Sequence, residues 1–241
     1  MNMEFQDLKN AIKYPLSDVR MILLLGAVLF LAELVNEVHG NDEYSTILKA
    51  ILTLVALIMS VLEAGYLFKV IEETTQGSES LPKFSHLKNI FIHGTKEIIV
   101  TSIFILFPMI EIVISAYFFS LSKITHNLGE LNLGYAFLVL GLISIMVIGF
   151  VLQGVILNMA HNRGSVRSAF HFGNIKEKIR RVGYKNLLLT YIIAFVTFGS
   201  LILFFSDTIK NIPFVGVLIL MFFIEPYLLL FNLRILGLVD R

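Results

Sequence analysis

The sequence contains no cysteine, and only 15% of its 241 residues are charged. Without cysteine the chain has no disulfides, thiolate metal sites or thiol nucleophiles. A water-soluble domain needs a polar exterior, and a composition that is 56% hydrophobic supplies too few polar side chains to cover one. Basic and acidic residues number 19 and 18, so net charge predicts no nucleic-acid partner. The composition therefore indicates a protein whose outer surface faces lipid.

Motifs of catalysis and metal binding are also missing. The sequence has neither a Walker-type phosphate loop nor a Gly-x-Ser-x-Gly elbow. Its histidines are not spaced with carboxylates as metal ligands are, and His86 and His93 stand seven residues apart among basic residues. We therefore expect no metal and no cofactor. An enzyme acting on lipids within the membrane is disfavoured because no paired acid and base is found.

Six apolar stretches are long enough to cross a bilayer, whose core of about 30 Å needs roughly 17–25 apolar residues in a helix. Strands are excluded because no segment alternates with period two and an open sheet is unstable in lipid. We predict an all-α integral membrane protein forming a single domain over residues 1–241. Its six spans are expected at residues 19–35, 46–68, 98–119, 133–157, 187–205 and 212–233.

The positions of the basic residues predict the orientation. Sixteen of the 19 Lys and Arg residues lie on the side of the chain termini, and only Lys49, Lys123 and Lys210 lie on the other side. Lysine and arginine are enriched in cytoplasmic loops. We therefore predict a multi-pass protein of the cell membrane with both termini in the cytoplasm.

A threefold internal repeat organises the predicted spans. The sequence from Phe5 to Asn10 recurs at residues 84–89 and more loosely at 172–177, each time with Lys four positions after Phe. An apolar residue follows at seven positions, so each segment has one apolar helical face. Each is then ended by a chain-breaking residue. We predict three parallel units of a basic surface helix, a bend and a helical hairpin, covering approximately residues 5–77, 84–164 and 172–241, with the bends at Pro15, Gly94 and Gly183.

Two segments resemble a known family. The first runs Gly65-Tyr-Leu-Phe-Lys-Val-Ile and then Gly77-Ser-Glu-Ser-Leu-Pro-Lys-Phe84; the second includes Ala160-His-Asn-Arg-Gly-Ser165. They are similar to the signature of an uncharacterised family of multi-pass membrane proteins found mostly in methanogenic archaea. This chain departs from the family pattern at residues 83–86, where members more often carry acidic residues and Trp. The resemblance implies a membrane fold and no particular activity.

Polar groups inside predicted spans need a reason, because a charged side chain at mid-helix costs about 2.5–3.5 kcal/mol on insertion scales. Glu63, Gln153 and Glu225 occupy similar positions in the second, fourth and sixth spans. Our hypothesis is that they meet at the repeat axis as a ligand or transport site; the alternative is ordinary hydrogen bonds between helices. Glu33 and Glu111, near the outer ends of their spans, are expected to reach water.

The sequence is compatible with two functions. The favoured one is a non-catalytic lipid-interacting or scaffold protein whose basic surface helices bind anionic headgroups on the cytoplasmic face. The alternative is a small-solute or ion transporter or channel that uses the polar groups at the repeat axis. A protein partner or a homo-oligomer is left open. The residues expected to contact headgroups or a partner are Lys9, Lys88, Lys176, Lys178, Arg180 and Arg181.

Overall fold

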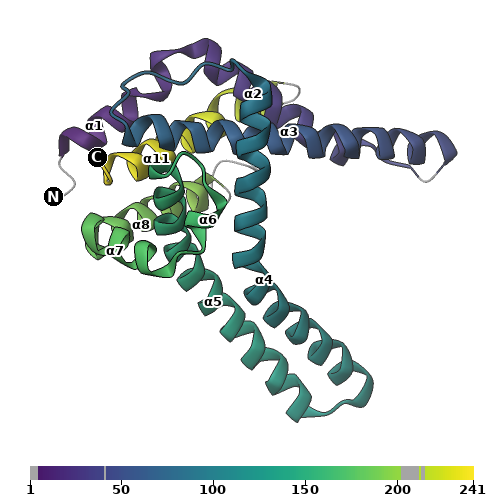
Figure 1. Cartoon of the computed structure of the whole chain (residues 1–241). Helices are drawn as coiled ribbons and strands as arrows, with labels where there is room; N and C mark the ends of the chain where they lie inside the picture. The colour runs from purple at the N-terminus through teal and green to yellow at the C-terminus, as the bar shows by residue number, and fades with distance from the viewer. Residues whose placement is uncertain (1–4, 41, 202–211, 213–214) are drawn as a thin grey trace.

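The computed structural model describes residues 5–40, 42–201, 212 and 215–241, and every regular element in these ranges is helical (Figure 1). The elements in chain order are α1 (Phe5–Lys13), the short 3-10 turn η1 (Pro15–Ser17), α2 (Val19–Glu33), the 3-10 turn η2 (Leu34–Glu37), α3 (Glu43–Thr75), α4 (Leu87–Thr125), α5 (Leu128–His161), α6 (Val166–Ala169), α7 (Phe172–Val182), α8 (Tyr184–Ser200), α10 (Val215–Ile219), the π-helical turn η4 (Leu220–Ile224) and α11 (Glu225–Leu238).

Several of these helices are long and apolar enough to cross a membrane. Within the described residues there are five such stretches: 19–36, α3, α4, α5 and Val215–Leu238. A sixth is obtained if α7 and α8, which are bent by 86° relative to each other, form one broken span. The predicted fifth span at 187–205 ends beyond Leu201, and its last four residues lie outside the described residues, as do two residues of the sixth. The fold is therefore all-helical and has the apolar helices typical of a membrane protein.

Polar side chains define where three of the long helices begin. Asp18 accepts a hydrogen bond from the backbone N–H of Arg20 at the start of α2, and Asp42 accepts one from Ser45 at the start of α3. Asn127 does the same for Gly129 at the start of α5, at 2.8 Å. The first N–H groups of a helix have no partner within it, so such side chains stabilise a helix start by about 1 kcal/mol each.

The bends predicted at Pro15 and Gly183 coincide with helix boundaries, but the bend predicted at Gly94 is wrong. Gly94 lies inside α4, which continues unbroken from Leu87 to Thr125. A Cβ atom at Gly94 would lie 1.9 Å from the carbonyl oxygen of Val61 in α3, and one at Gly65 would lie 1.9 Å from that of Ile90. The two glycines let α3 and α4 cross with their backbones in contact, a use of small residues that is common between membrane helices.

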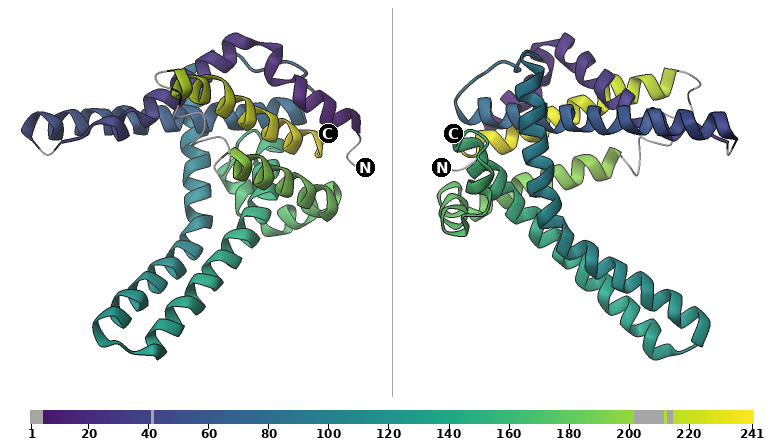
Figure 2. Two further views of the ribbon diagram at one scale, coloured as in Figure 1. Left: turned by 180° about the vertical axis from the view of Figure 1, so that it is seen from behind. Right: turned by 45° about the vertical axis from the view of Figure 1, so that its right-hand side comes forward.

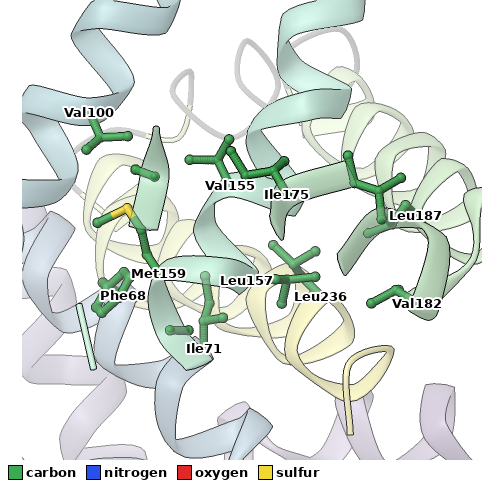
Figure 3. Close-up of a cluster of buried hydrophobic side chains, with 13 residues drawn as sticks. Phe68, Ile71, Val100, Val155, Leu157, Met159, Ile175, Val182, Leu187 and Leu236 are labelled. Carbon is green, nitrogen blue, oxygen red and sulfur yellow. The ribbon is translucent and has the colours of Figure 1, made fainter. Parts of the chain in front are cut away.

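The helices converge at one end of the molecule and diverge at the other. Figures 1 and 2 show the hairpin of α4 and α5 and the first half of α3 projecting away from the remaining helices. The start of α1 and the C-terminus lie together at the opposite end, on a face that we call the terminal face, formed by α1, α7 and the end of α11. The main core lies near this face, where the side chains labelled in Figure 3 pack together from α3, α4, α5, α7, α8 and α11.

Glu111 is a second departure from the sequence prediction. It was expected to reach water at the outer end of a span, yet only 6% of it is exposed and its Oε2 atom has no hydrogen-bond partner in the described part of the chain. It packs beside Gly141 of α5, at the same interface where Ser115 donates a hydrogen bond to the carbonyl of Gly134 at 2.7 Å. Because α4 extends to Thr125, Glu111 lies well before the end of the helix. Glu33, in contrast, is exposed at the end of α2.

Candidate functional site

A buried arginine ties α11 to the other helices at the terminal face. The guanidinium of Arg234 donates hydrogen bonds to Oγ1 of Thr74 at 3.1 Å and to the carbonyl oxygen of Ser78 at 2.5 Å. It also lies over the ring of Tyr14, 4.2 Å from the ring centroid, in a cation–π contact. The two hydrogen bonds join segments 160 and 156 residues apart in the chain, and the contact with Tyr14 reaches back to the segment that follows α1. Because Arg234 is only 3% exposed, we assign it a structural role.

The segment that carries the family resemblance is held against the same helix ends. Tyr66 donates a hydrogen bond to the carbonyl of Pro82 at 3.0 Å and stacks on Phe84, with ring centroids 4.0 Å apart. Tyr14 donates one to the carbonyl of Ser80 at 3.3 Å. The two halves of the motif are therefore in contact, with the Gly-Tyr-Leu half fixing the Leu-Pro half in place. This contact explains the motif as a structural element and needs no ligand.

The surroundings of Tyr14 predict a pH dependence. Burial raises the pKa of its phenol above the ordinary 10.0, and the neighbouring Arg234 only partly offsets this rise. Above pH 10 the unfolded chain therefore loses this proton before the folded chain does, so Tyr14 contributes less to stability as pH rises. We expect the melting temperature (Tm) difference between the wild type and Tyr14→Phe to shrink above pH 10. A difference that stays constant from neutral pH into this range would contradict the assignment.

Lys178 is not available to bind headgroups, and its assignment as a headgroup residue is wrong. Its ammonium forms an ion pair with Asp240 at 2.9 Å, and the two side chains are only 5% and 3% exposed. It belongs to the buried face of α7, together with Ile175, Ile179 and Val182. The pair fastens α7 to the last residues of the chain. Lys178 thus contributes to the fold of the terminal face and not to its surface charge.

The other predicted headgroup residues are exposed. They belong to α1, α4 and α7, and Arg181 forms only an exposed ion pair with Glu177 at 3.4 Å. Of the three helices, α7 has the greatest number of these cations and a clearly separated apolar face. The exposed basic residues of the predicted set are Lys9, Lys88, Lys176, Arg180 and Arg181.

Two cavities involve the helices around α5, one of them lined in part by α7. The first, of about 230 Å³, is polar and is lined by Asn174, Glu177, Lys178 and Arg181 of α7 and by Asn158, His161 and Asn162. The second is an apolar groove of about 450 Å³ between α5 and α8, lined by Met146, Val147, Phe150, Leu188, Tyr191, Ile192 and Phe195. No feature of the sequence predicts this groove. Its residues are ordinary apolar residues of two spans, and only the local contact of α8 with α5 brings them together.

The three polar residues predicted at the repeat axis are not equally placed. Glu63 lies within electrostatic range of Glu225 and of Glu33, and Glu97 lies within range of Glu63. Gln153 is engaged elsewhere, because it accepts a hydrogen bond from Thr190 of α8 at 3.0 Å. The structure therefore brings Glu63 and Glu225 near each other and gives Gln153 a partner in α8. In the part of the chain that is described, no group of three or more metal-ligating side chains is found.

One family model matches the chain, over residues 48–236, and it is described as a protein of unknown function (DUF4013). No curated protein and no solved structure matches the chain. The match begins in the first half of α3 and ends in α11. It therefore includes both halves of the motif that carries the family resemblance, the bent pair of helices α7 and α8, and Arg234. It confirms the resemblance to an uncharacterised family. Since the match covers most of the sequence, this chain belongs to the DUF4013 family.

Proposed function

We propose that this protein is a non-catalytic, multi-pass protein of the cell membrane that binds anionic lipid headgroups through the basic side chains of its terminal face. The observation that supports this most is α7. Ile175, Ile179 and Val182 anchor one face of the helix in the core, while Lys176 and Arg180 remain exposed. Because the apolar face packs on the protein, α7 is held in place with its cations outward, and such exposed Lys and Arg side chains attract anionic headgroups.

The proposal includes six spans, both termini in the cytoplasm and three parallel repeats. The distribution of Lys and Arg supports it, since cytoplasmic loops are enriched in both residues. In that orientation the terminal face meets the leaflet whose anionic lipids attract basic segments by about 1 kcal/mol per Lys or Arg. Exposed Lys9 of α1 and Lys88 of α4 would add to the attraction provided by α7.

The proposal predicts that anionic lipid stabilises the folded chain. We expect the Tm to be higher in phosphatidylcholine vesicles containing phosphatidylglycerol than in pure phosphatidylcholine, because a ligand of the folded state raises stability. The variant with Lys176, Arg180 and Arg181 replaced by Gln should lose most of an effect of roughly 5–10 °C. High salt should reduce the effect in the wild type.

The matched control replaces Lys49 and Lys123 by Gln. Both lysines are predicted to lie on the opposite side of the membrane, so this variant should keep the response to phosphatidylglycerol. An equal Tm in the two lipid compositions for the wild type would refute lipid binding. Equal losses in the control and in the α7 variant would show that total charge, and not the terminal face, is responsible.

A second candidate function is transport of a cation or proton, and one specific observation favours it. The Oε2 atom of Glu97 is buried without a hydrogen-bond partner among the described residues, and Glu97 lies within electrostatic range of Glu63. Buried carboxylates in a membrane often mark an ion pathway. Proton or cation flux in vesicles that is abolished by Glu63→Gln, but not by Glu130→Gln at the start of α5, would support this function. The absence of such flux in the wild type would reject it.

A further inference from the structure

Helices α7 and α8, with the bend between them at Gly183, form an elbow that contacts α5 with both helices. Helix α7 crosses α5 at Gly154, where a Cβ atom would lie 2.5 Å from Cγ1 of Ile179. At Gly183 the backbone adopts a φ of +95°, and α8 then leaves at 86° to α7. Helix α8 meets α5 next, since Thr190 donates a hydrogen bond to Gln153 and the ring of Tyr191 lies against Gly149, and it then diverges from α5 (Figures 1 and 2). The elbow therefore contacts α5 with both helices, and the groove lies where α8 and α5 begin to diverge.

The contacts of α7 determine which way each of its flanks faces. Asn174, Glu177 and Arg181 share the polar cavity with residues from the last turn of α5, including His161. This flank therefore faces the C-terminal end of α5. Helical periodicity places Phe172, Lys176 and Arg180, spaced four apart, on the opposite flank. That flank faces the other way along α5, and all three of its side chains are exposed.

The apolar groove begins on the same side of α7 as this cationic flank. Phe150 and Val147 of α5 lie about 6 Å and 10 Å from the level of Gly154, at 1.5 Å per residue. Leu188 of α8 also lines the groove, and it lies one helical turn after Lys185, which is exposed. Among the described residues, no charged side chain lines the groove. Its volume of about 450 Å³ lies within the range of about 300–1,000 Å³ that is typical of ligand pockets.

We propose that this elbow is a binding site for one anionic phospholipid, with a hydrocarbon chain in the groove between α5 and α8 and the phosphate at Lys176, Arg180 and Lys185. The two parts of the site select this occupant together. A soluble anion would leave the groove unused, and an uncharged lipid would leave the cations unpaired. The inference rests on the proposed function, because it names the place where one of the bound lipids sits.

The absence of tryptophan from the sequence provides a direct test. In Ile192→Trp the introduced indole is the only one in the chain and lies in the groove. In the control Leu189→Trp it lies on an exposed face of α8 outside the groove. Each variant is reconstituted in phosphatidylcholine vesicles with a minor fraction of lipid brominated on its chains. The brominated lipid is either phosphatidylglycerol or phosphatidylcholine.

We expect brominated phosphatidylglycerol to quench Ile192→Trp as if it were enriched on the order of tenfold over its bulk fraction. Brominated phosphatidylcholine should show no enrichment, and Leu189→Trp should report the bulk fraction for both lipids. Adding Lys176→Gln and Arg180→Gln to Ile192→Trp should remove the enrichment. If Ile192→Trp does not fold, Phe195→Trp places the indole in the same groove and should give the same result.

Equal quenching of Ile192→Trp by the two brominated lipids would overturn the site. If the wild type still melts at a higher temperature with phosphatidylglycerol, the proposed headgroup binding stands and only this site is wrong. If that Tm difference is also absent, the proposed function itself fails. Enrichment that survives Lys176→Gln and Arg180→Gln would likewise overturn the role given to these cations.

Discussion

Replacing Gly94 by alanine is expected to lower the Tm strongly. The new Cβ atom would lie 1.9 Å from the carbonyl oxygen of Val61 and 2.8 Å from the backbone nitrogen of Gly65. These are backbone atoms, so no side-chain rotation relieves the contact and α3 must move away from α4. Overpacking typically costs about 1–3 kcal/mol, and we expect a loss at or above the upper end of this range. Gly65→Ala should behave alike, because its Cβ would meet the carbonyl oxygen of Ile90.

The matched control is Gly199→Ala. Gly199 lies near the end of α8, and no atom of the described residues lies within 4 Å of the position that its Cβ would occupy. Alanine has the higher helix propensity by about 1 kcal/mol, so this variant should be as stable as the wild type or slightly more stable. Thermal unfolding in one detergent measures all three proteins. If Gly94→Ala has the same Tm as the wild type, α3 and α4 do not cross at this pair of glycines.

The second large effect is expected at the ion pair between Lys178 and Asp240. Lys178→Met removes the cation but leaves a carboxylate that is only 3% exposed at its side chain. Removing one member of a buried pair usually costs about 3–5 kcal/mol, because the remaining charge has no partner. We therefore expect a loss of this size, with α7 and the end of α11 separating first.

The double variant distinguishes a buried pair from a surface pair. Lys178→Met combined with Asp240→Leu should recover most of the lost stability, since an apolar pair of similar volume replaces a buried ion pair at little cost. Arg181→Met at the exposed pair with Glu177 should change stability by less than about 1 kcal/mol. Additive losses in the double variant would show that Lys178 and Asp240 do not interact.

The helical fold could be predicted from the sequence because long apolar stretches without period-two alternation indicate helices and exclude strands. The interpretation of individual residues was less secure. Gly94 was interpreted as a chain breaker, yet glycine serves equally well where two helices come close, and only the position of α3 distinguishes the two uses. Glu111 was misplaced for a related reason, since the length of α4 decides how far it lies from the water.

For Lys178 the sequence did contain a usable signal. It stands three residues after Ile175 and four before Val182, so helical periodicity places it on the apolar face of α7. Grouping Lys178 with its basic neighbours as a headgroup ligand ignores this helical phase. The groove between α5 and α8 had no comparable signal. Its apolar side chains are indistinguishable in sequence from those that face lipid, and the bend at Gly183 determines which of them meet.

Native mass spectrometry of the full chain is the most direct test of anionic lipid binding. The chain is purified in a mild detergent from membranes that contain phosphatidylcholine in excess over phosphatidylglycerol. We expect the protein ion to retain phosphatidylglycerol in preference to the more abundant lipid, and to lose this preference when Lys176, Arg180 and Arg181 are replaced by Gln. A protein ion that carries no lipid, or one that carries the two lipids in their bulk proportion, would contradict the proposed function.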